Sequence, residues 1–91
     1  MKNKIALSSL AMDLQRAALG YHGGSNQMGK RFLDEALKRK NEVDMSTVKP
    51  YVRVLLNKME GIKLQKETDK IAEDALLYSI LFQNAAVKIQ S

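Results

Sequence analysis

ALLYSILFQNAAV, residues 75–87, is the stretch that decides the fold, because it runs for thirteen positions without a charge. Apolar residues at heptad-like spacing pass through it over residues 71–89. This pattern predicts a helix that is capped by Thr68 or Asp69 and ends near Lys88. The uncharged stretch is shorter than the roughly 20 apolar residues of a membrane span. We therefore expect a helix that is enclosed by protein rather than by lipid.

Aliphatic side chains cover much of the remaining circumference of this helix, more than three short neighbouring helices can bury. Leaving several of them in water would forgo about 1.5 to 3 kcal/mol each. We expect a homodimer or larger assembly, with a different protein as a further possible partner. Asn84, with its neighbour Gln83, fits either a register-setting hydrogen bond across the interface or simple exposure to water. The residues expected at the interface are Leu76, Leu77, Ile80, Leu81, Asn84 and Val87.

Helical spacing also dominates the first half of the chain. A first helix is expected over about residues 2–21, ending at Gly23-Gly24, where glycine can supply a left-handed cap. A second helix then begins near Ser25-Asn26, turns Met28 inward among other apolar residues, and ends at about residues 41–43. The glycines leave open whether these are two helices or one helix with a kink.

A third helix is expected between the second helix and the C-terminal one. It begins between residues 44 and 50, because Pro50 suits a first helical turn, and Gly61 is its expected end. Together the four segments predict an all-α protein. Residues 1–91 form one domain, a small antiparallel bundle of about four helices with the fourth helix at its centre.

Composition narrows the chemistry that this chain can perform. Cysteine is absent and histidine occurs once, which excludes disulfides, thiolate metal sites and cysteine nucleophiles, and we expect no metal and no cofactor. The net charge of +5 is spread along the chain, with eight basic and five acidic residues in 1–46 and seven and five in 47–91. It permits an acidic partner without requiring one. No targeting segment or membrane span is recognised, so a cytoplasmic location is the default expectation.

The single histidine follows an arginine by six positions, in Arg16-Ala-Ala-Leu-Gly-Tyr-His22. This resembles the arginine, five residues, histidine signature of the HEPN class of small helical ribonucleases. The resemblance implies a dimer that cleaves RNA, with His22 promoting attack by the ribose hydroxyl and Arg16 holding phosphate. The seven residues lie in the first helix rather than late in the chain, where that family has them. Six helical steps also rotate the two side chains about 120 degrees apart, so they converge only if the helix unwinds near Gly20.

His22 has a second interpretation, as a helix-terminal residue that interacts with the last carbonyls. The densest basic group of the chain likewise has two interpretations. The first is a surface that contacts nucleic-acid phosphates without regard to sequence. Interleaved Asp34 and Glu35 favour instead an ordinary solvated helix face with acid–base pairs four residues apart. The group consists of Lys30, Arg31, Lys38, Arg39 and Lys40.

The expected function is therefore a helical interaction module, more an interaction protein than an enzyme, that self-associates through its apolar C-terminal helix. The alternatives are a HEPN-like RNA-cleaving dimer and a nonspecific nucleic-acid-binding protein.

Overall fold

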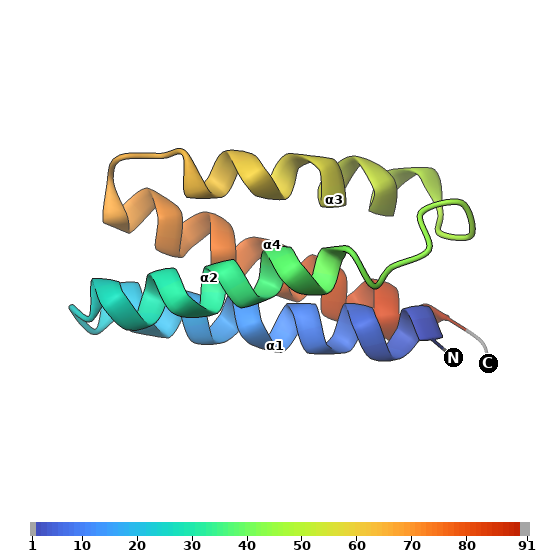
Figure 1. Ribbon diagram of the computed structural model, residues 1–91, viewed down its shortest axis with the longest axis horizontal. Coiled ribbons are helices and arrows are strands. Elements are labelled where there is room, and N and C mark those ends of the chain that lie inside the picture. Colours follow the sequence, from blue (N-terminus) through green and yellow to red (C-terminus); the bar gives the residue numbers. More distant parts are fainter. Residues whose placement is uncertain (1, 90–91) are drawn as a thin grey trace.

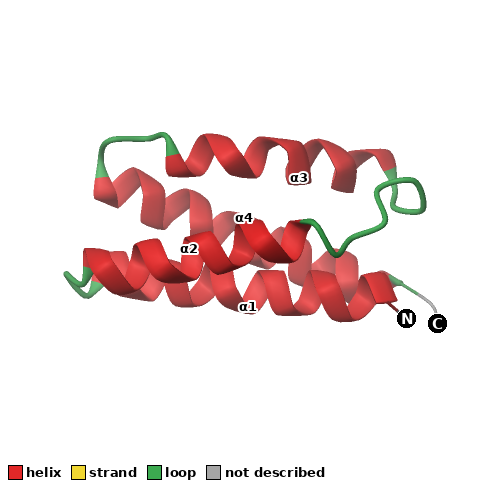
Figure 2. Ribbon diagram, in the orientation of Figure 1, coloured by secondary structure: helices red, strands yellow, loops and turns green. Residues whose placement is uncertain are grey.

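The computed structural model describes residues 2–89, and this part of the chain is entirely α-helical apart from its connections (Figures 1 and 2). The expected all-α class is confirmed, and the opening segment forms two separate helices. Consecutive helices run antiparallel, in a body of about 38 × 18 × 18 Å. The helices are α1 (Lys2–His22), α2 (Asn26–Lys40), α3 (Pro50–Lys63) and α4 (Thr68–Lys88).

The turn between α1 and α2 follows from the glycines that the sequence places there. Gly24 has a φ of +81°, a left-handed conformation that glycine adopts without a steric penalty. The backbone N–H of Ser25 donates to the Gly20 carbonyl at 2.8 Å, and that of Gly24 donates to the Tyr21 carbonyl at 3.3 Å. These two bonds close α1 in a Schellman motif. The Ser25 hydroxyl then accepts the N–H of Met28 and begins α2.

Small residues explain how closely the helices approach each other. Where α1 meets α2, a Cβ built on Gly20 would lie 2.6 Å from the Gly29 backbone nitrogen. Alanines make up much of the buried faces of α1 and α4, which pack extensively against each other. The buried residues of α3 are all larger, and α3 makes fewer close contacts with its neighbours. Interaxial distance depends on the side chains at the contact, so α3 stands further out.

The helices form two layers, one of α1 and α4 and the other of α2 and α3. Across the layers, α2 packs on α1 and α3 packs on α4, and within its layer α2 also contacts α3. In Figure 1 the α2/α3 layer lies nearer the viewer and α4 is fainter behind it. The core between the layers contains Leu7, Leu10, Leu14, Leu56 and Phe82, all fully buried. The expected central position of α4 is not what the structure has, because α1 packs closely along both α2 and α4, whereas α4 packs closely along α1 alone.

Three local expectations differ from the structure. Gly61 does not end α3, which continues to Lys63, because the glycine keeps a helical conformation with no positive φ. Met28 is not turned inward: it lies in the first turn of α2 and is exposed. Neither Thr68 nor Asp69 caps α4, because the N-cap is Glu67 and its side chain makes no capping hydrogen bond.

Candidate interaction surface

The outer side of α4 carries most of the residues that the sequence assigned to an interface. Leu76, Leu77, Ile80 and Val87 are 41%, 50%, 51% and 66% exposed. Asn84 is also exposed, whereas Leu81 is partly buried. The opposite side of the helix, with Ala75, Phe82 and Ala85 among its residues, fills the core. The structure therefore separates the two apolar sides of α4, one used within the chain and one left uncovered by it.

A second apolar stripe, on α1, was missed by the sequence analysis. Ile5, Met12 and Leu19 are 67%, 48% and 61% exposed. They are seven residues apart, so they lie above one another on one side of the helix. The buried leucines of α1, Leu10 and Leu14, point the opposite way. The seven-residue spacing is present in the sequence, beside the more regular stripe of residues that the structure buries.

The two stripes belong to one surface. α1 and α4 are neighbours in the same layer, and each turns its buried side toward the core and the α2/α3 layer. Helical geometry therefore directs the opposite sides of both helices away from that layer. We call this surface the α1/α4 face. Its large apolar residues are Ile5, Met12, Leu19, Leu76, Leu77, Ile80 and Val87.

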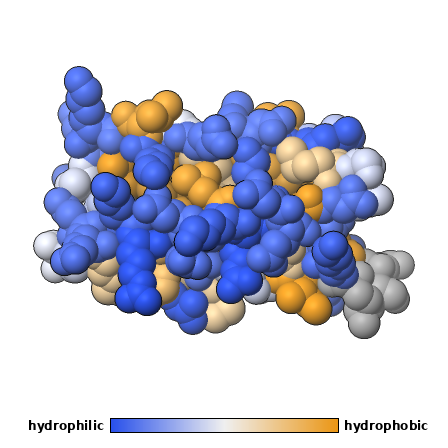
Figure 3. Space-filling view, in the orientation of Figure 1, coloured by the Kyte–Doolittle hydropathy of each residue, from blue (hydrophilic) through white to orange (hydrophobic). Residues whose placement is uncertain are grey.

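Charge is sparse on the α1/α4 face. α4 has no charged residue over residues 75–87. Between Ile5 and Gln15, α1 has one charged residue, Asp13, and its side chain turns toward α2. The other side of the molecule differs: Figure 3 shows mainly hydrophilic residues over the α2/α3 side, with apolar ones scattered among them. Uncharged aliphatic residues gathered on one face are typical of a protein contact surface.

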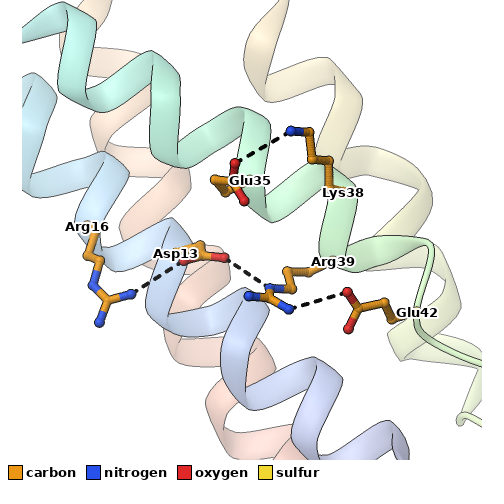
Figure 4. Close-up of polar contacts among 6 residues, drawn as sticks. All are labelled: Asp13, Arg16, Glu35, Lys38, Arg39 and Glu42. Carbon is orange, nitrogen blue, oxygen red and sulfur yellow. Dashed lines mark hydrogen bonds and ion pairs between the residues drawn. The ribbon is translucent and has the colours of Figure 1, made fainter.

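Asp13 lies where α1 meets α2, between two arginines (Figure 4). Its Oδ1 is 3.5 Å from Arg16 Nη1, and its Oδ2 is 3.7 Å from Arg39 Nε. Arg39 also reaches Glu42, at 3.3 Å. Burial raises the pKa of the Asp13 carboxyl, because desolvation outweighs the opposing attraction of Arg39 and Arg16. Asp13 Oδ2 and Arg39 Nε are buried without a hydrogen-bond partner, so this ion pair is poorly satisfied.

The structure does not bring Arg16 and His22 together within one chain. α1 is a continuous helix to His22, and no unwinding occurs at Gly20. His22 is exposed in the last turn. Arg16 pairs with Asp13, and its guanidinium lies 5.7 Å from the centre of the Phe32 ring. The condition for convergence that the sequence analysis set is therefore not met inside a protomer.

The basic group on α2 is largely engaged by acids of the same chain. Lys38 Nζ lies 3.5 Å from Glu35 Oε1, and Lys40 Nζ lies 3.6 Å from Glu60 Oε1. Arg39 is held by Asp13 and Glu42, as described above. Among the residues that the structure describes, this leaves Lys30 and Arg31 as the members of the group without an ion pair. None of these ion pairs is the expected pair four residues apart, because Glu35 meets Lys38 at a spacing of three and Asp34 meets Lys63 of α3, at 2.8 Å.

Residues 2–89 contain neither a metal-binding cluster nor a membrane-spanning helix. No group of three or more histidine and acidic side chains in this range has a geometry that holds a metal ion. None of the helices there has the length and apolar character that crossing a bilayer requires. Comparison of the chain with protein-family models, with curated proteins and with solved structures finds no match.

Proposed function

We propose that this protein is a helical interaction module that forms a homodimer through the α1/α4 face. The observation that carries the proposal is the joining of two exposed apolar stripes, one on α1 and one on α4, into a surface nearly free of charge. Burying these side chains against another surface would remove apolar area from water, which favours association at about 25 cal/mol per Å².

Two features favour a second copy of this chain as the occupant. The middle of this face carries no charge on α4, so two copies can meet there across a twofold axis without opposing like charges, and ten of the 15 basic residues lie in residues 26–67. A standard interface takes about 800 Å² from each partner. This is about one seventh of the 5687 Å² accessible surface of the chain, an area that one side of two 21-residue helices can supply.

Asn84 gives the proposed dimer a polar element among its apolar residues. It is exposed on the α1/α4 side of α4, between Ile80 and Val87. A single amide in an apolar contact sets register, since its hydrogen bonds are lost when the helices slide. Of the two interpretations of Asn84, the proposal adopts the hydrogen bond across the interface.

The test replaces one exposed aliphatic residue on the face and a matched one elsewhere. Ile80→Glu places a charge in the middle of the α1/α4 face, where Ile80 is 51% exposed. Val54→Glu places the same charge on α3, where Val54 is 50% exposed. Sedimentation velocity over a range of protein concentrations measures the mass of each variant.

We expect wild type and Val54→Glu to reach twice the mass of a single chain as concentration rises, and Ile80→Glu to stay at the mass of one chain. Circular dichroism confirms that both variants remain helical. A wild-type protein that stays monomeric throughout contradicts the proposal, and so does an Ile80→Glu variant that dimerises like wild type. A mass above one chain that disappears on nuclease treatment would favour nucleic-acid binding instead.

A further inference from the structure

A second feature of the molecule lies at the end of the bundle, away from the α1/α4 face. A cavity of about 580 Å³ opens there between the first turns of α1 and α3, the last turn of α4, and the loop that joins α2 to α3. Its floor is apolar, formed by the buried residues Leu7, Val48, Val52 and Ala85. The volume falls within the range of about 300 to 1,000 Å³ that is typical of small-molecule sites.

Three lysines border this cavity: Lys2 from α1, Lys49 from the start of α3, and Lys88 from the end of α4. All three lysines are exposed, so their ammonium groups are in contact with water and accessible to a ligand. Among the described residues that line the cavity, Asp44 is the acidic one. The lining thus combines an apolar floor with an excess of positive charge at the rim.

The wall formed by the α2–α3 loop is held in place by α1. The Asn3 side chain donates from Nδ2 to Thr47 Oγ1 at 2.7 Å, and its Oδ1 accepts the backbone N–H of Asp44 at 2.9 Å. The Asp44 carboxylate accepts bonds from the backbone N–H and the hydroxyl of Ser46. Asp44 is therefore engaged within the loop. A wall fixed by these bonds lowers the ordering cost of binding.

We propose that this cavity binds a fatty-acid anion, with the carboxylate at the lysine rim and the alkyl chain on the apolar floor. An alkyl chain gains from burial against Leu7, Val52 and Ala85, and the carboxylate gains from the ammonium groups of Lys49 and Lys88. A neutral alcohol of the same length lacks the second contribution, and a cationic amphiphile is repelled by the rim.

The test uses decanoate, below the concentration at which it forms micelles, with the 91-residue chain labelled with ¹⁵N. Decanol and decyltrimethylammonium serve as neutral and cationic ligands of the same chain length. We expect saturable amide shifts at Val48, Val52 and Ala85 with decanoate, weaker ones with decanol, and none with the cation. Decanoate shifts that are absent, that decyltrimethylammonium reproduces, or that centre on Ile80 rather than Val52 would overturn the proposal.

A pair of charge reversals tests the rim. Lys49→Glu alters a lysine that lines the cavity, and its side chain makes no capping bond that the substitution would remove. Lys58→Glu makes the same change at an exposed position of α3 outside the cavity. We expect Lys49→Glu to weaken decanoate binding roughly tenfold and Lys58→Glu to change it less than about twofold. Equal effects of the two substitutions would contradict a role for the rim. The dimer test is independent of this one, because it alters a different side of α4.

Discussion

At the scale of single residues, two glycines set how closely α1 approaches α2. Gly20 of α1 lies directly against Gly29 of α2, and a Cβ at Gly20 would be 2.6 Å from the Gly29 nitrogen and 2.9 Å from its Cα. Backbone atoms cannot rotate aside as the end of a side chain can. Helix ends and close packing are both expected of glycines from the sequence, but only the structure shows that Gly20 and Gly29 meet each other.

Gly20→Ala is expected to destabilise the protein, because α1 and α2 must separate to admit the methyl group. The expected loss in the free energy of unfolding is about 1 to 3 kcal/mol, measured by denaturant titration. Gly61→Ala is the matched control: the glycine is helical and nothing lies within 4 Å of its Cβ position. There alanine should raise stability by up to about 1 kcal/mol through its better helix propensity. Two similar changes in stability would show that the glycine contact is not tight.

Asp13 predicts a dependence of stability on pH. Its pKa is raised on folding, so the folded chain holds this proton more tightly than the unfolded chain does. The contribution of Asp13 to stability is therefore greatest at low pH. It is lost as pH rises from the carboxyl's ordinary pKa of 3.8 through its higher folded value.

Asp13→Asn removes this titration, while Arg16 and Arg39 remain free to reach water, since their side chains are 47% and 43% exposed. We expect the stability of the variant relative to wild type to improve as pH rises through that window. Thermal unfolding of both proteins from acid to neutral pH measures the difference. A difference that is constant with pH, or that moves the other way, would contradict the raised pKa.

At the scale of helices, the number, order and approximate ends of the elements could be predicted from the sequence, because Gly23-Gly24 and Pro50 interrupt regular apolar spacing. Contacts between helices could not, since they depend on which side chains are small where two helices meet. The misplaced centre of the bundle is an example. The strong apolar character of residues 75–87 suggested that α4 is the central helix. The alanines of α1 instead allow α1 to lie closely against two other helices, α2 and α4.

α3 is expected to be the least stable helix. It is buried through Val52, Leu56, Met59 and Ile62, with no small residue that allows close approach, and it makes fewer close contacts than α1. Regions with few contacts open locally before the whole chain unfolds. Native-state hydrogen exchange should therefore show faster exchange at the backbone amides of Leu55–Met59 than at those of Leu10–Leu14. Equal protection of the two segments would indicate that the four helices open as one unit.

At the scale of the whole molecule, half of the α1/α4 face could be predicted from the sequence and half could not. The α4 residues were identifiable because a helix apolar on nearly all sides needs a second contact surface. The α1 residues were not, because Ile5, Met12 and Leu19 form a thin stripe whose meaning depends on which helix lies beside it. The cavity at the end of the bundle was also beyond sequence reasoning, since it joins residues from α1, α3, α4 and a loop.

The two ends of the described chain lie side by side, since Lys2 and Ile89 border the same cavity (Figure 1). Because the two ends are neighbours, the chain could be circularly permuted to begin at a different helix and keep the same packing. A short peptide joining residue 89 to residue 2, with new ends opened in the exposed link at residues 64–67, would preserve every helix. The same arrangement would carry a domain fused to either end to the same pole of the molecule, opposite the turn at Gly24.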